Sequence, residues 1–161
     1  MKPRALLMLA VFWAAAWAQH SNGYVFFAPG AVVAGGGGAM TFHLGGGGEG
    51  ILGKGVGAGI ELGVLGPKQF SDALGVLSAN GYYHFRHGKH HKVDPFVTGG
   101  YSLFFRQGTA NMYNLGVGAN YWFSGRLGFR LELRDQLGSW CGCGTAHFPS
   151  VRFGLAFRSG G

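Results

Sequence analysis

Apolar and polar residues alternate with a period of two over most of the chain from Gly23 to Arg158. In the stretch 54–65, the even-numbered positions from Val56 to Val64 are apolar, and the odd-numbered positions from Gly55 to Gly63 are glycines and Glu61. Successive side chains of a strand point to opposite faces, so this alternation predicts β-strands. We expect eight of them, over residues 23–34, 39–52, 54–65, 74–86, 93–106, 110–123, 126–136 and 147–158.

The length of these stretches favours strands that cross a membrane. They exceed the ~5–6 residues of an average strand and reach the ~9–11 residues that a tilted strand needs to span a bilayer. Very short connections are expected around Gly53 and at Ser124-Gly125, as in hairpins. The predicted fold class is therefore all-β, a closed antiparallel eight-stranded up-and-down transmembrane β-barrel.

Composition decides which face of the strands points inward. Charged residues make up only 12% of the chain, too few for the surface of an ordinary soluble domain, and 33 of the 161 residues are glycine. Glycine is a poor residue for a solvated strand face, but it leaves room for bulky neighbours inside a narrow barrel. We therefore expect the glycine-rich, charged face inside and the apolar face in lipid. Aromatic pairs such as Phe26-Phe27, Tyr82-Tyr83 and Phe104-Phe105 are expected near the membrane interfaces.

The N-terminus has the pattern of an export signal. Lys2 and Arg4 precede an apolar stretch over residues 5–15, and Ala16-Trp17-Ala18 is a small-x-small cleavage site. We expect residues 1–18 to be a cleaved signal peptide and residues 19–161 to be the barrel domain, with Gln19 first in the mature chain. The net charge is +7, but the basic residues are spread over the strands of an exported protein, so no nucleic-acid partner is expected.

The candidate site consists of the charged residues at strand positions whose side chains are expected to point into the barrel. Burying a charge without a partner costs several kcal/mol, so these side chains must pair with one another. We expect Glu132 to bridge Arg152 and one of Arg130 and Arg134, with Arg106 as a further candidate for the interior. The predicted structural network comprises Glu49, Glu61, Arg130, Glu132, Arg134 and Arg152.

Two other groups of residues could carry chemistry. Cys141 and Cys143, followed by His147, could supply part of a zinc site, a small disulfide or inert thiols. The histidine-rich tract 84–91 could bind a metal, but a solvated basic turn is favoured. No set of nucleophile, base and orienting residue is apparent. We therefore expect no catalytic residues, no metal site, no cofactor and no enzyme activity.

Several segments carry a family resemblance: residues 95–101 (PFVTGGY), 120–123 (NYWF), 127–132 (LGFRLE) and 152–158 (RFGLAFR). With these the chain resembles the small eight-stranded outer-membrane β-barrels, the opacity-protein-like group. Arg152, Gly154 and Phe157 match the family's C-terminal assembly signal, whereas Ser159 stands where a second aromatic residue is usual. The resemblance implies export to a Gram-negative-type outer membrane, with outer-membrane lipid and the assembly machinery as partners.

The family's roles are diverse, so three functions stay open at this point. The first is a structural or surface-interaction role, with a lumen plugged by paired charges. The second is a narrow, porin-like passive pore for ions or small solutes. The third is a secreted barrel that binds an apolar ligand. We expect the protein to be a monomer.

Overall fold

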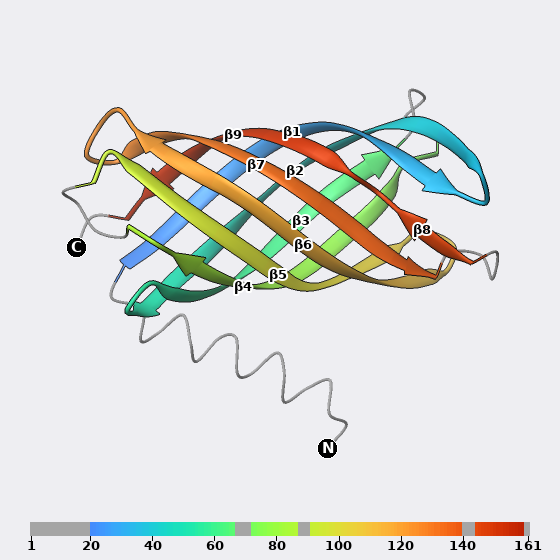
Figure 1. The fold of residues 1–161 in the computed structure, drawn as a ribbon, viewed down its shortest axis with the longest axis horizontal. Helices are drawn as coiled ribbons and strands as arrows, with labels where there is room; N and C mark the ends of the chain where they lie inside the picture. Colours follow the sequence, from blue (N-terminus) through green and yellow to red (C-terminus); the bar gives the residue numbers. More distant parts are fainter. Residues whose placement is uncertain (1–19, 67–71, 87–90, 140–143, 160–161) are drawn as a thin grey trace, which may run out of the picture.

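The computed structural model describes residues 20–66, 72–86, 91–139 and 144–159 (Figure 1). The predicted signal peptide, Cys141, Cys143, His87 and His90 lie outside these residues. The alternating stretches form the strands β1 (His20–Ala34), β2 (Gly37–Gly53), β3 (Val56–Gly66), β4 (Leu74–His84), β5 (Val93–Phe105), β6 (Thr109–Trp122), β7 (Leu127–Ser139), β8 (Thr145–His147) and β9 (Ser150–Arg158). Within the described residues, no helix is long and apolar enough to span a bilayer.

The sheet closes on itself. Each strand from β1 to β7 pairs with the next in antiparallel register, β7 pairs with both β8 and β9, and both of these pair with β1. The tilted ribbons wrap around a single barrel, and β1 begins at the end of the barrel where β9 ends (Figure 1). Closure leaves no open sheet edge. A strand in the hydrocarbon core needs this, because no water is present there to bond unpaired backbone N–H and C=O groups. The predicted eight-stranded up-and-down barrel is confirmed.

The eighth barrel strand differs from the prediction of one continuous stretch over residues 147–158. It consists of β8 and β9, separated by Phe148 and Pro149. Pro149 has no N–H to donate to the ladder, although its carbonyl still accepts from the Ala31 nitrogen at 3.0 Å. Phe148 bonds to β7 instead, through the Gln136 carbonyl at 2.8 Å. The barrel wall therefore stays closed across the interruption.

The two faces of the strands have the predicted orientation. Leu131 is 51% exposed, whereas its neighbour Glu132 is 1% exposed and points into the barrel. The same alternation places most of the apolar side chains of β3, β6 and β9 on the outside. An exposed apolar wall of this extent is stable only in a hydrophobic surrounding, which a bilayer supplies.

Interior glycines make room for large side chains. A Cβ atom at Gly47 would lie 2.8 Å from the hydroxyl of Tyr24, and one at Gly118 would lie 2.7 Å from the ring of Phe96. Contacts this short would displace both rings, so the glycines allow Tyr24 and Phe96 to fold across the narrow lumen. The high glycine content thus follows from the width of the barrel.

The aromatic pairs divide between the two faces. Phe26, Tyr82 and Phe104 are buried inside the barrel, whereas Phe27, Tyr83 and Phe105 are exposed on its outer wall. The expectation of interfacial aromatic side chains therefore applies only to the outward member of each pair. The inward members pack within the lumen, because neighbouring residues of a strand always face opposite ways.

Leu131→Arg is expected to destabilise the barrel by ~2–4 kcal/mol, because it places a charge on the lipid face near the middle of β7. The measurement is a denaturant titration of protein folded in lipid vesicles. A matched probe is a cysteine at position 131, which should resist a water-soluble thiol reagent in the folded, reconstituted protein. Ready labelling of that cysteine together with an unchanged stability of Leu131→Arg would show that this face does not contact lipid.

Candidate functional site: the charged interior of the barrel

Glu61 of β3 is a carboxylate on which three donor side chains converge. Its two oxygens each lie 2.8 Å from Nη1 of Arg152 on β9. Arg134 of β7 reaches the same carboxylate at 3.4 Å, and the Tyr24 hydroxyl of β1 donates to it at 3.1 Å. All four side chains are buried. These contacts connect strands that are not neighbours in the sheet, so they cross the lumen.

Glu132 pairs with two arginines of its own strand. Its carboxylate accepts from Nε of Arg130 at 3.3 Å and from Nε of Arg134. The expected bridge from Glu132 to Arg152 is wrong. The two residues are register partners on β7 and β9, but the Arg152 guanidinium extends across the lumen to Glu61. Its long side chain makes the backbone register a poor guide to its partner.

Arg130 is also held by a second carboxylate and by aromatic rings. Its Nη1 lies 3.3 Å from Glu49 Oε2 on β2. Its guanidinium carbon lies 4.2 Å from the ring centre of Tyr24 and 4.1 Å from that of Phe96. Cation–π contacts of this kind gain strength where water is excluded. They contribute to fixing the cation inside the barrel.

All six residues of the predicted interior network are therefore buried in the lumen, and each forms an ion pair with another member. Arg106 is not among them. Its position has inward parity, but β5 ends at Phe105, so the side chain leaves the barrel. It forms an exposed ion pair with Asp72 at 3.3 Å. The placement of Arg106 in the interior is wrong because the strand ends before it.

His84 and Asp94 belong to the interior and were not predicted there. His84 Nδ1 lies 2.9 Å from Asp94 Oδ2, and its Nε2 lies 3.4 Å from Glu49 Oε1. A solvated turn is therefore the wrong environment for His84, the last residue of β4. The side-chain alternation of β4 could have predicted the inward orientation of His84, because His84 shares a face with Tyr82 and Asn80, which also point inward.

His43 of β2 completes the contacts of Arg152. Arg152 Nη2 donates to His43 Nδ1 at 3.3 Å, because a guanidinium can only donate. The guanidinium also lies 4.3 Å from the ring centre of Phe26. His43 is buried in the lumen, and its ring serves as an acceptor within the arginine network.

Uncharged layers follow the charged centre toward the end of the barrel where β1 meets β2. Ser102 is the centre of a polar layer: its hydroxyl contacts Ser78 at 2.8 Å, Asn114 at 2.9 Å and Gln136 at 3.4 Å. Beyond it, an apolar cluster fills the interior, formed by Leu65, Val76, Phe104, Met112, Ala146 and Phe148. Both layers contain side chains that close-pack in the lumen.

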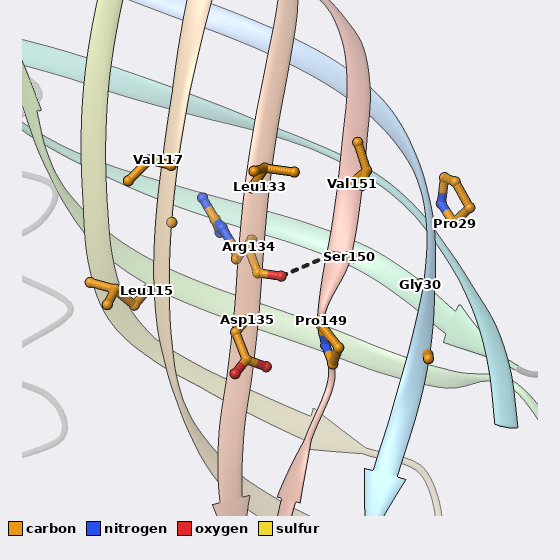
Figure 2. Close-up of a pocket in the computed structure, with 12 residues that line it drawn as sticks. Pro29, Gly30, Leu115, Val117, Leu133, Arg134, Asp135, Pro149, Ser150 and Val151 are labelled. Carbon is orange, nitrogen blue, oxygen red and sulfur yellow. Dashed lines mark hydrogen bonds between the residues drawn. The ribbon is translucent and has the colours of Figure 1, made fainter. Parts of the chain in front are cut away.

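The outer wall carries a shallow apolar depression over β6, β7, β9 and β1 (Figure 2). Leu115, Leu133 and Val151 line it, with Pro29 and Pro149 at the interruption of the eighth strand (Figure 2). Ser150 Oγ donates to the Arg134 carbonyl at 3.3 Å there. The depression lies on the lipid-facing wall and contains almost no polar surface, so it is suited to hydrocarbon chains rather than to a polar substrate.

Metal ligands do not gather in the part of the chain that the structure describes, where no group of three or more His, Cys, Asp or Glu side chains could hold an ion. His147 is described and lies 2.9 Å from Asp135 Oδ2 on the exterior. The candidate metal ligands Cys141 and Cys143 lie outside the described residues.

A closed ring of strands, an apolar outer wall and a charged interior together define the fold of the small outer-membrane β-barrels. The sequence matches no protein-family model and no curated protein. Solved structures do match. The N-terminal β-barrel domain of OprF from Pseudomonas aeruginosa aligns with a TM-score of 0.67 and 16% identity, over 88% of this chain and 98% of that domain.

Two further structures support the same conclusion. Neisserial surface protein A aligns with a TM-score of 0.71 and 13% identity, over 85% of this chain and 96% of that one. A transmembrane β-barrel designed de novo aligns with a TM-score of 0.58 and 17% identity, over 86% of this chain and 95% of the design. Likeness at such low identity establishes the fold, and the role has to be argued from the interior.

Proposed function

We propose that this protein is an outer-membrane β-barrel with a structural or surface-interaction role, whose lumen is plugged by paired charges. The observation that carries the proposal is the set of ion pairs that cross the lumen. Glu61 of β3 binds Arg152 of β9, and Glu49 of β2 binds Arg130 of β7. An ion path along the axis would require these side chains to separate, and breaking buried pairs is costly.

The uncharged layers support the plug over the pore. A solute that passed the charged centre would next meet the hydrogen-bonded layer around Ser102 and then the apolar cluster around Phe104. An apolar constriction opposes the passage of ions because it does not replace their hydration. The orientation of the side chains also disfavours a secreted barrel with an apolar ligand, since polar and packed apolar side chains fill the interior and the outer wall is apolar.

The apolar wall supports a location in a membrane. The predicted export signal would carry the chain across the inner membrane, so the outer membrane is the proposed location. The proposed partners are therefore outer-membrane lipid and the machinery that assembles barrels, with the protein present as a monomer. The interior charges act structurally in this proposal: they hold strands on opposite sides of the barrel together. No catalytic step is assigned to them.

Membrane fractionation of cells that express the full chain tests the proposed location. The protein should sediment with the outer membrane, resist extraction by salt and start at Gln19 in N-terminal sequencing. On a gel it should migrate differently before and after boiling, as closed barrels do. Recovery in the soluble fraction, or from the inner membrane with Met1 retained, would overturn the proposal.

A further inference from the structure

The connections at the end of the barrel where β1 begins and β9 ends carry an uncompensated positive charge. Lys54 lies in the turn between β2 and β3, Arg86 and Lys92 lie between β4 and β5, and Arg126 lies between β6 and β7. All four side chains are exposed. We call these four residues the basic collar. They come from three different connections and so surround the rim of the barrel.

No carboxylate side chain balances the collar. The sequence has six Asp and Glu residues, and four of them, Glu49, Glu61, Asp94 and Glu132, are buried in the lumen. The other two, Asp72 and Asp135, lie toward the opposite end of the barrel, where each has a basic partner. Within the described residues, none of the four collar cations forms an ion pair. The two ends of the barrel therefore differ in charge.

The collar is held at a fixed height on the barrel. The Lys92 carbonyl accepts from the Trp122 nitrogen at 2.7 Å, and the Arg126 carbonyl accepts from the Arg158 nitrogen at 2.8 Å. The backbone of these two cations is thus bonded to the rim itself. Their side chains start where the strands end.

Outward aromatic residues mark the membrane interface directly beside the collar. Tyr83 and Phe85 are exposed at the end of β4, next to Arg86, and Tyr121 and Phe123 are exposed at the end of β6, close to Arg126. Aromatic side chains in such positions lie at the level of the lipid headgroups. Cations at the same height are within reach of headgroup phosphates.

We propose that the basic collar is a binding surface for the headgroups of anionic phospholipids in the inner, periplasmic leaflet. This rests on the proposed function, because it requires a barrel inserted in the outer membrane. The leaflet follows from topology: the eight strands of the barrel, with β8 and β9 forming the eighth, put the start of β1 and the end of β9 on one side. A chain exported by the predicted signal enters the membrane from the periplasm, so this side is assigned to the periplasm. Peptidoglycan is the weaker candidate, since the aromatic residues place the collar at the membrane surface.

Lipid selectivity in reconstituted bilayers tests the collar. Protein purified from membranes is inserted into phosphatidylcholine bilayers that contain a trace of spin-labelled phosphatidylglycerol or spin-labelled phosphatidylcholine. Electron spin resonance then gives the motionally restricted fraction of each label. A single basic residue strengthens attraction to an anionic surface by roughly fivefold, so we expect a preference for phosphatidylglycerol of at least about threefold. This preference should disappear at ~1 M salt, because a Debye length of ~3 Å screens the attraction between the collar and the headgroups.

Variants assign the preference to the collar. The fourfold variant Lys54→Gln, Arg86→Gln, Lys92→Gln and Arg126→Gln should lose it, whereas Arg106→Gln, a matched change at the other end, should keep it. If the fourfold variant fails to fold, the single variants Lys92→Gln and Arg126→Gln should each reduce the preference. A preference that survives removal of the collar, or one that is absent from the inserted wild-type protein, would overturn the proposal.

Two further outcomes would also overturn it. Co-sedimentation with peptidoglycan sacculi that depends on the collar, without any lipid preference, would assign the surface to peptidoglycan. Labelling of Ser124→Cys in intact cells by a membrane-impermeant reagent would place the collar on the outside of the cell. Failure of the barrel itself is distinguishable, because a protein that does not insert restricts neither spin-labelled lipid.

Discussion

Glu61→Gln is expected to lower the free energy of unfolding by ~3–5 kcal/mol, the cost of breaking a buried ion pair by removing one partner. The carboxylate receives both contacts of Arg152 Nη1 at 2.8 Å and a third contact from Arg134 at 3.4 Å. A carboxamide has the same shape but no charge and only one acceptor oxygen. The Arg152 guanidinium would stay buried without its carboxylate, and Arg134 would keep only its contact with Glu132. Denaturant titration in vesicles, followed by the gel shift of the folded barrel, measures the loss.

Asp72→Asn is the matched control, since it makes the same chemical change in an exposed ion pair with Arg106. Exposed pairs contribute little, so its effect should stay below about 1 kcal/mol. Removing both partners with Glu61→Gln and Arg152→Met should recover part of the lost stability, because no unpaired Arg152 charge then remains. Equal, small effects of Glu61→Gln and Asp72→Asn would show that water fills the lumen and screens the network.

Phe104→Ala is expected to cost ~3–5 kcal/mol, the range for removing a large aromatic side chain from a packed core. Phe104 is 1% exposed in the apolar cluster at the end of the lumen, and the centre of its ring lies 5.3 Å from the centre of the Phe148 ring. The barrel wall is held by its hydrogen-bond ladder and cannot collapse into the gap. The same titration in vesicles measures the effect.

Phe105→Ala is the control, because Phe105 is the next residue, 40% exposed on the outer wall. Lipid chains can fill the space that this change leaves, so its cost should be clearly smaller. If the two variants lose the same stability, the apolar cluster is not a packed core. Larger loss in Phe105→Ala would reverse the assignment of the two faces.

The alternation of side chains predicted the fold and the orientation of both faces correctly. A period of two is a backbone property, so Leu131 outside and Glu132 inside follow directly from the sequence once the glycine face is placed inward. The interruption at Phe148 and Pro149 was missed because the predicted strand was extended back to residue 147, although the clear alternation begins only at Val151. The missing N–H of Pro149 was the signal for that break.

The pairing of the interior charges could not be predicted in the same way. Register places Glu132 opposite Arg152, but a guanidinium lies several bonds from its backbone and reaches strands across a narrow barrel. Which carboxylate it meets depends on the tilt of the strands and the width of the lumen. His84 was misassigned for another reason: its basic neighbours, such as Arg86, lie past the end of β4 and face solvent, whereas His84 still has the parity of the strand.

The central claim is that paired charges and packed side chains close the lumen, and single-channel recording in planar bilayers tests it most directly. The folded wild-type protein should insert without measurable conductance. Glu61→Gln should also stay closed, because the layer around Ser102 and the apolar cluster around Phe104 still fill the lumen. Steady conductance of the wild-type protein, with an ion selectivity that changes in Glu61→Gln, would contradict the plug and establish the barrel as a pore.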